Sequence, residues 1–272
     1  MSQQIITSRE ELLSYTGLYI DIDGTAVNSE PIIREVIGEI SLPAGYKVEP
    51  KHWDTLAGLG DKGVWAKICE WHPPFAETFV SGPEFEKARL KRYVERIDEV
   101  QPHQSVLDLT NAFLDAGKPA YAVTNSPPRI AVPHLKGTGY PLDCMAGLIT
   151  ETEANNLGLP SKPQPAMYDM AIERERTRSA IVGLSADFTK VSCLAVEDSP
   201  TGVEAGLRAG MTVIQLTDMC GQMDDTKVSK LQQEFGGIYV PMTFSELQGL
   251  VSSPNVAHVN GARAPLEQHI DG

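Results

Sequence analysis

The chain has 272 residues, 42% of them hydrophobic and 22% charged, which is the composition of an ordinary globular protein with one substantial core and room for a smaller second unit. Its formal net charge of −13 and the lack of a Lys/Arg-rich run argue against a nucleic-acid partner, because binding a polyanion requires a basic face. No stretch approaches the roughly 18 apolar residues that span a bilayer, and residues 1–13 lack a signal-peptide run, so we expect a cytoplasmic protein without a membrane partner.

The cysteines give no sign of a disulfide framework or a zinc site. Cys69, Cys144, Cys193 and Cys220 are scattered along the chain and form no C-x-x-C pair. This spacing favours reduced thiols, which suits a cytosolic protein.

Residues 17–25 predict a short buried strand that ends in two carboxylates, Asp21 and Asp23, followed by Gly24 and a hydroxyl. Acidic groups fit a strand buried on both faces only where it emerges at its carboxyl end. Two residues apart, these carboxylates point the same way and repel each other unless a cation lies between them or one keeps a proton. An Asp-Gly turn without chemistry is the alternative for this tetrapeptide alone. An EF-hand loop is excluded because its glycine would be sixth, not fourth.

Residues 30–101 differ in character from the rest and predict a helical insertion. They hold all three tryptophans and no convincing run of buried strand. The clearest helix covers residues 84–99, where apolar residues recur at i, i+3, i+4 and i+7 from Leu90. The chain then returns to a different pattern at residue 102.

From residue 102 to about 216, strands and helices alternate, which predicts a parallel sheet with helices on both faces. The strand at 119–123 ends in Thr124 and Asn125, and the strand at 193–196 ends in Glu197 and Asp198. These polar ends would meet those of the first strand at the sheet edge where open α/β folds bind ligands. Further strands are predicted at 146–149 and 213–216, further helices at 106–114, 167–174, 201–209 and 244–250, and a loosely held tail from about 251.

The residue types at this edge predict a site that binds a metal ion and a phosphoryl group. Carboxylates from two strands can hold Mg²⁺, a hard cation that prefers oxygen ligands. The Thr124 hydroxyl and backbone N–H groups near a helix N-terminus would bind a phosphoryl group. The missing positive charge is best supplied by Lys162, which lies in a loop stiffened by prolines just before a helix. Taken alone, Lys162 would be an unremarkable surface lysine.

In combination, these motifs resemble those of the haloacid dehalogenase-like superfamily of phosphatases and phosphomutases. The four family motifs are matched in order at residues 21–25, 123–126, 162–165 and 196–210. The resemblance covers the chain from about residue 19 to 216, and is greatest to the subgroup with a helical cap after the first motif, similar to β-phosphoglucomutase and to sugar or glycolate phosphatases.

The resemblance implies an α/β fold with a Rossmann-like doubly wound parallel sheet and an inserted all-helical cap. The catalytic core would comprise residues 1–29 and 102–272, and the cap domain residues 30–101.

The resemblance also implies roles for the motif residues. Asp21 would attack phosphorus and carry an aspartyl phosphate, and Asp23 would protonate the leaving oxygen and then activate water. Thr124, Asn125 and Lys162 would bind the phosphoryl oxygens.

The implied metal is Mg²⁺, held by Asp21, by the backbone carbonyl of Asp23 and by Asp198. Glu197 would be a further ligand or a group that orients the ligands.

The implied activity is that of a Mg²⁺-dependent phosphatase, a monomer or homodimer, acting on a small phosphorylated metabolite of the sugar phosphate or phosphoglycolate type. Asp23 favours phosphate esters, since family dehalogenases lack this acid. One alternative is a phosphomutase with the same intermediate, but Ile33 stands where β-phosphoglucomutase has a histidine. The other is a non-catalytic binding protein on the same fold, which usually loses a motif residue. Asn28, Ser161 and the long stretch 176–191 depart from the family pattern and leave the substrate and cap hinge open.

A glycine-rich turn at residues 57–65 is the candidate for substrate selection. Glycines let a backbone approach a ligand closely. We expect Asp61 or Lys62 to touch the non-phosphate part of the substrate and Trp65 to shape the pocket wall. The alternative is a helix-connecting turn whose charges face water.

Overall fold

The computed structural model describes residues 6–56, 61–183 and 189–252. Its internal contacts divide the chain into two compact units, one formed by Met1–Ala26 with Pro102–Gly272 and the other by Val27–Gln101. We call them the sheet unit and the helical unit and describe each by itself. Among the described residues, no helix combines the length and the apolar character needed to cross a membrane.

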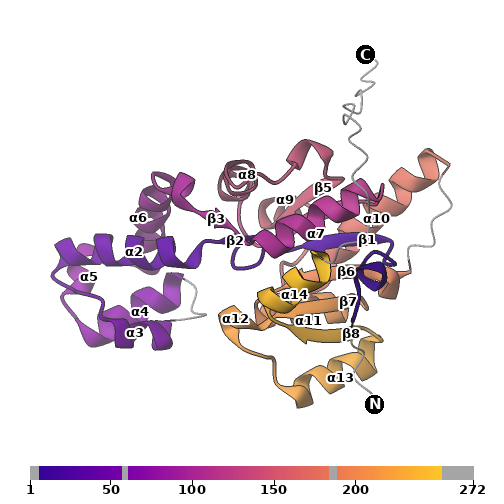
Figure 1. Ribbon diagram of the computed structural model, residues 1–272. Helices are drawn as coiled ribbons and strands as arrows, with labels where there is room; N and C mark the ends of the chain where they lie inside the picture. The colour runs from indigo at the N-terminus through magenta and orange to yellow at the C-terminus, as the bar shows by residue number, and fades with distance from the viewer. Residues whose placement is uncertain (1–5, 57–60, 184–188, 253–272) are drawn as a thin grey trace. The chain divides into compact units, whose positions relative to one another are not determined.

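The sheet unit is built on a six-stranded sheet with the strand order β5-β4-β1-β6-β7-β8 (Figure 1). Its strands are β1 (Gly17–Ile20), β4 (Ala120–Thr124), β5 (Gly147–Thr150), β6 (Cys193–Glu197), β7 (Thr212–Leu216) and β8 (Ile238–Met242). Neighbouring strands in this part of the chain are parallel throughout. Because the strand order reverses at β1, the carboxyl ends of β4, β1 and β6 adjoin the switch point where such sheets bind ligands. The predicted doubly wound α/β fold is confirmed.

Helices connect these strands and cover the sheet. They are α1 (Arg9–Leu12), α7 (Gln104–Asp115), α8 (Pro128–Gly137), α9 (Glu151–Asn156), α10 (Ala166–Ile181), α11 (Pro200–Arg208), α12 (Thr217–Cys220), α13 (Asp225–Phe235) and α14 (Phe244–Val251). Helix α7 packs against β1, β4 and α14, whereas α10 packs on β4 and β5, and α11 on β6 and β7.

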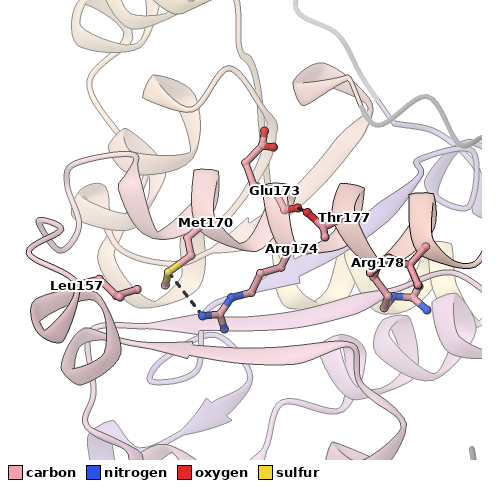
Figure 2. A pocket seen from close by; sticks show the side chains of 7 residues that line it. Leu157, Met170, Glu173, Arg174, Thr177 and Arg178 are labelled. Carbon is pink, nitrogen blue, oxygen red and sulfur yellow. Dashed lines mark hydrogen bonds between the residues drawn. The ribbon is translucent and has the colours of Figure 1, made fainter. Parts of the chain in front are cut away.

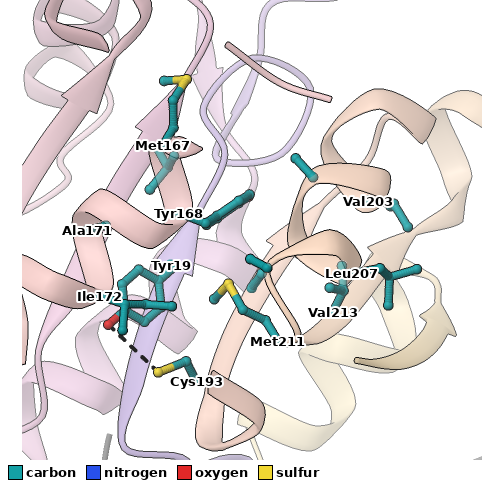
Figure 3. Close-up of a cluster of buried hydrophobic side chains, with 14 of the residues drawn as sticks. Tyr19, Met167, Tyr168, Ala171, Ile172, Cys193, Val203, Leu207, Met211 and Val213 are labelled. Atoms are coloured by element: carbon teal, nitrogen blue, oxygen red, sulfur yellow. Dashed lines mark hydrogen bonds between the residues drawn. The ribbon is translucent and has the colours of Figure 1, made fainter. Parts of the chain in front are cut away.

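The main core lies between the sheet and helices α10, α11 and α13 (Figure 3). Side chains alternate along a strand, so that Tyr19 of β1 faces this cluster, while Leu18 and Ile20 are buried on the opposite face. The ring of Tyr19 stacks on that of Tyr121, with centroids 5.5 Å apart. Burial on both faces is why β1 reads as an unbroken apolar run until Asp21.

Several elements of the sheet unit differ from the sequence prediction. The helix predicted at 167–174 continues as α10 to Ile181. The prediction stopped early because the buried positions beyond 174 are occupied by the polar residues Glu175 and Ser179 and not by apolar ones. The strand β8 and helix α13 were not predicted. Pro241 obscures β8 in the sequence, but β8 lies at the edge of the described sheet, where proline is tolerated.

The helical unit contains α2 (Glu30–Ser41), α3 (Pro50–Leu56), α4 (Asp61–Trp71), α5 (Phe75–Thr78) and α6 (Gly82–Val94). They enclose a cluster whose centre is a set of edge-to-face and tilted rings from Phe75, Phe79 and Phe85. The helix predicted at 84–99 is α6, which ends at Val94. The short strands β2 (Val27–Asn28) and β3 (Gln101–Pro102) pair with each other where the chain enters and leaves the unit.

Candidate active site

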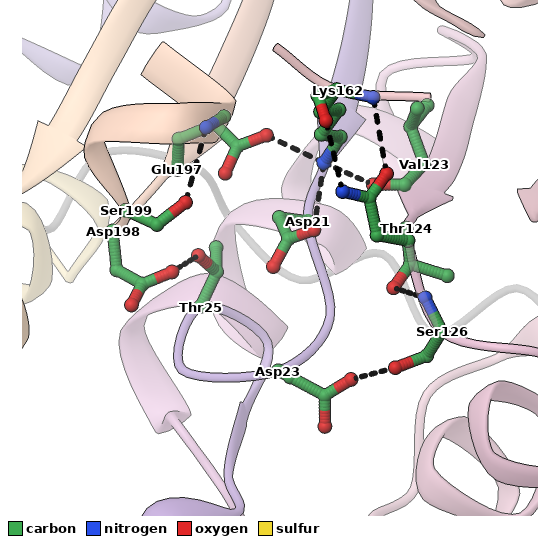
Figure 4. A network of polar contacts seen from close by, with 12 residues as sticks. Asp21, Asp23, Thr25, Val123, Thr124, Ser126, Lys162, Glu197, Asp198 and Ser199 are labelled. Atoms are coloured by element: carbon green, nitrogen blue, oxygen red, sulfur yellow. Dashed lines mark hydrogen bonds and ion pairs between the residues drawn. The ribbon is translucent and has the colours of Figure 1, made fainter. Parts of the chain in front are cut away.

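The polar residues that follow β1, β4 and β6 lie together at the carboxyl edge of the sheet (Figure 4). The backbone N–H of Asp21 donates to Val196 O at 3.0 Å, which continues the β1–β6 pairing to the first carboxylate. The strand order thus brings together the three motifs that follow strands. The remaining motif, the loop with Lys162, reaches the same place before α10.

Lys162 lies at the centre of a buried ionic cluster. Its Nζ donates to Asp21 Oδ1 at 2.7 Å, to Glu197 Oε1 at 2.6 Å and to the carbonyl of Val123 at 2.6 Å. These bonds use all three N–H groups of the ammonium. The hydroxyl of Tyr168, a residue absent from the predicted site, also donates to Glu197 Oε1. Lys162 therefore pairs with Asp21 and also with Glu197, whereas the phosphoryl contact predicted for it stays a prediction.

Asn125 braces the loop that carries Lys162. Its side-chain amide accepts from Lys162 N at 3.2 Å and donates to Lys162 O at 3.3 Å. Thr124, which is buried, accepts with its Oγ1 from Ser126 N at 3.0 Å. The phosphoryl contacts predicted for these residues stay a prediction.

Asp198 is held against the loop after β1. Thr25 Oγ1 donates to Asp198 Oδ1 at 2.9 Å, and Gln215 of β7 donates to the Asp198 carbonyl at 3.2 Å. Gly24 has a φ of 82°, and a Cβ there would lie 2.4 Å from Asp198 Oδ2. Glycine at this position is thus required both by the backbone conformation and by the close approach of the carboxylate.

Asp23 contacts a different element. Ser126 Oγ donates to Asp23 Oδ2 at 2.6 Å, and Nδ1 of the fully buried His134 lies 3.2 Å from Asp23 Oδ1. His134 lies on α8 and was not predicted. Its signal in the sequence is weak, because it occupies a core position four residues after Ile130, where a histidine is usually structural.

Burial raises the carboxylate pKa values of the cluster. Burial, reinforced by the charge of Asp21, raises the pKa of Glu197 to about 8 and that of Asp198 to about 7. Burial likewise raises the pKa of Asp21, against the opposing effect of Lys162. The pKa of Lys162 is raised because its two carboxylate partners outweigh burial, which acts to lower it. Three buried carboxylates therefore share this part of the described chain with a single ammonium, so negative charge exceeds positive charge there.

A divalent cation fits this deficit. Oxygens of Asp21, Glu197 and Asp198 lie within 4.8 Å of one another. The donors are all hard oxygens, which suits Mg²⁺. Within the described chain, Glu197 Oε2 is also buried without a hydrogen-bond partner. A divalent ion together with Lys162 would balance the charge of the three carboxylates.

A model of the haloacid dehalogenase-like hydrolases matches residues 15–210, which is most of the chain and includes all four motifs. The chain belongs to this family.

Solved structures of other haloacid dehalogenase-like proteins share its fold. A family hydrolase from Deinococcus radiodurans R1, with bound phosphate and sodium, is 22% identical and superposes with a TM-score of 0.62 over 88% of this chain and 99% of that one. A putative β-phosphoglucomutase from Thermotoga maritima is 17% identical, with a TM-score of 0.61 over 86% and 97%. A predicted phosphoglycolate phosphatase from Haemophilus somnus 129pt is 19% identical, with a TM-score of 0.61 over 88% and 99%.

The helical unit of this hydrolase gives the predicted selectivity residues distinct surroundings. Asp61 forms a two-pronged ion pair with Arg89, including an Nη2–Oδ2 bond of 2.8 Å. Trp65 packs on the unit's hydrophobic cluster and donates from its indole nitrogen to Phe79 O at 2.8 Å. Lys62 is exposed. Residues 57–60 of the glycine-rich turn lie outside the described residues.

A hollow on the outer side of α10 contains none of the predicted site residues (Figure 2). Two of its lining arginines have acidic partners: Arg174 pairs with Glu153, and Arg178 pairs with Glu175 at 2.7 Å. Because these charges are already neutralised, the hollow offers little to a phosphorylated substrate.

Proposed function

We propose that this hydrolase is a Mg²⁺-dependent phosphatase that cleaves a small phosphorylated metabolite through an aspartyl phosphate on Asp21. The observation that carries the proposal is the buried cluster in which Asp21 and Glu197 bind the ammonium of Lys162 and Asp198 adds a third carboxylate, with Asp23 two residues from Asp21. A carboxylate nucleophile, a nearby proton donor and a charge deficit are the groups that phosphate-ester cleavage needs.

The first step transfers the phosphoryl group to the enzyme. A carboxylate oxygen of Asp21 attacks phosphorus, and the bond from phosphorus to the leaving oxygen breaks. Asp23 gives its proton to that oxygen, so the alcohol leaves neutral and Asp23 becomes a carboxylate. Lys162 holds Asp21 at 2.7 Å and limits the motion of the nucleophile.

The second step restores the enzyme. Asp23 takes a proton from water as the water oxygen bonds to phosphorus, and the bond between phosphorus and Asp21 breaks. Inorganic phosphate leaves, Asp21 is again a carboxylate and Asp23 again carries a proton. Splitting one difficult displacement into two is the advantage of the covalent route.

The residues that would hold Mg²⁺ are Asp21, Asp198 and Glu197, with the Asp23 carbonyl as the further predicted ligand. The ion would supply positive charge beside the transferring phosphoryl group. The Thr124 hydroxyl and the backbone N–H groups at the start of α8 would bind the phosphoryl oxygens from the other side of the site.

The geometry favours hydrolysis over phosphomutase chemistry. Ile33 stands at the position of the mutase histidine, and its side chain packs against the hydrophobic cluster of the helical unit. An isoleucine there cannot supply an imidazole. Substrates of the sugar phosphate or phosphoglycolate type remain our proposal.

Within the helical unit, Lys62 is the better candidate for a substrate contact, because the Asp61 carboxylate is already paired with Arg89. Trp65 is proposed to shape the pocket wall.

The test is release of phosphate from a panel of phosphate monoesters by the purified protein with Mg²⁺. We expect activity on at least one alkyl phosphate, and loss of turnover in Asp21→Asn, which keeps the size of the side chain and removes the nucleophilic charge. Near-normal turnover by Asp21→Asn would refute the mechanism. Running the same panel with Lys62→Ala and Asp61→Ala tests the selectivity proposal, which fails if neither variant changes the ranking of substrates.

A further inference from the structure

The carboxylate of Asp23 is contacted on both oxygens by one segment of the chain, the end of β4 and the helix α8 that follows it. Ser126 Oγ donates to Oδ2 at 2.6 Å, and His134 Nδ1 lies 3.2 Å from Oδ1. The Asp23 side chain is 28% exposed, whereas that of His134 is fully buried. The Asp23 carboxyl group thus keeps partial exposure while it contacts the protein.

His134 lies on the buried side of α8. The buried residues of the helix are Ile130, Ala131, His134 and Leu135, so His134 is the polar member of an otherwise apolar stripe. Its carbonyl accepts from Thr138 Oγ1 at 2.5 Å and from Thr138 N at 3.1 Å, which fixes the backbone on its C-terminal side. A histidine costs more to bury than the leucine or isoleucine that this stripe otherwise uses, because its ring nitrogens lose water.

The orientation of a carboxyl group decides whether it can transfer a proton. The donor oxygen must lie within hydrogen-bond reach of the leaving oxygen, and misplacement by about 1 Å can cost on the order of 10²-fold in rate. Side chains that carry out catalysis hold such geometry only when neighbouring groups lock their rotamers.

We propose that His134, acting with Ser126, is a positioning residue that holds the Asp23 carboxyl group in the orientation for proton transfer. The inference rests on the proposed function. His134 touches neither substrate nor phosphorus and acts only through Asp23. It contributes to the step in which the proton moves from Asp23 to the leaving oxygen and, in the second step, from water to Asp23.

This role predicts a dependence on the leaving group. An alkyl phosphate expels an alkoxide, which requires the Asp23 proton, whereas 4-nitrophenyl phosphate expels a stable phenolate that does not. Because kcat/KM covers the steps up to formation of the aspartyl phosphate, the ratio of kcat/KM for the two substrates reports proton transfer separately from phosphate binding.

The experiment compares His134→Leu, which fills the buried space without a ring nitrogen, and His134→Asn, whose amide nitrogen replaces Nδ1. We expect His134→Leu to lower kcat/KM by about 10- to 100-fold on the best alkyl phosphate and by less than about 3-fold on 4-nitrophenyl phosphate, as for partial loss of general acid catalysis. His134→Asn should recover most of the alkyl activity. If His134→Leu fails to fold, Ser126→Ala replaces it as the test. This smaller change removes the hydroxyl that donates to Asp23 Oδ2 and should show the same selectivity.

The matched control is His103→Leu, the same exchange at a histidine whose ring stacks on Phe244. It should leave the ratio of the two kcat/KM values unchanged. Equal losses on both substrates, or no loss on either, would overturn the positioning role while leaving the phosphatase intact. A wild-type protein that cleaves neither substrate, with Asp21→Asn equally inactive, would overturn both proposals.

Discussion

Gly24 shows at the scale of a single residue how the site constrains the chain. Its φ of 82° disfavours any side chain, and its closeness to Asp198 Oδ2 excludes a Cβ even if the backbone could accept one. Backbone strain and side-chain collision can be separated, because Gly139 has the same φ of 82° and open space around the position of its Cβ.

We predict that Gly24→Ala destabilises the protein more than Gly139→Ala and disturbs its response to Mg²⁺, whereas Gly139→Ala does not. Gly139→Ala should cost only the backbone strain, about 1–2 kcal/mol. Urea unfolding of both variants measures the difference, and titration with Mg²⁺ measures the effect on the site. Equal destabilisation of the two variants would show that the loop after β1 moves freely away from Asp198.

Helices α7 and α14 show how a titratable group at an element boundary affects stability. His103 precedes α7, and its ring stacks on that of Phe244 at the start of α14, with centroids 3.9 Å apart. Burial lowers the pKa of His103 to about 4, against a smaller opposing effect of Asp218. The folded protein thus keeps this ring neutral at pH values where the unfolded chain protonates it.

We predict a loss of stability as the pH falls from about 6.5 to about 4, the window between the unfolded and folded pKa values. The unfolded state binds more protons in this window, so stability rises with pH there. The contribution is on the order of 1–2 kcal/mol, because the ring is only partly shielded from water. Thermal unfolding of His103→Leu and of the wild type at pH 7.5 and pH 4.5 should show a smaller acid-induced drop in Tm for the variant. Parallel drops would assign the acid sensitivity to other groups.

At the scale of the whole molecule, the sheet unit brings three buried carboxylates together at the switch point, and two of them pair with Lys162. Such repulsion opposes folding unless a cation is bound. Since a ligand that binds only the folded state stabilises it, the metal and the fold are thermodynamically linked.

We predict that Mg²⁺ raises the Tm of the wild type and that Asp198→Asn removes most of this shift. At a concentration 100 times its Kd, Mg²⁺ should add about 2.7 kcal/mol. Asp169→Asn is the control, since Asp169 pairs with Lys190 at the surface and belongs to no metal cluster found in the described chain. A wild-type Tm that is indifferent to Mg²⁺ and to chelator would contradict the assignment of the cluster.

The sequence by itself determined the fold class and the motif residues, because both depend on local patterns. An apolar strand that ends in acid, hydroxyl or amide groups can be recognised within ten residues, and its alternation with helices implies a parallel sheet. Edge strand β8 was not predicted, because Pro241 interrupts the local strand pattern. Its position is defined by its pairing with the neighbouring strand β7.

Only the tertiary structure decided what surrounds the groups proposed to be catalytic. Asp23 and Ser126 are 103 residues apart, and His134 is farther still along the chain, so no periodicity connects them. A histidine in an apolar helical stripe has the same local signature whether it fills a core or supports a carboxylate. Its contact with Asp23 exists because the sheet places β4 beside β1 and α8 begins where β4 ends, which is a consequence of strand order and not of sequence pattern.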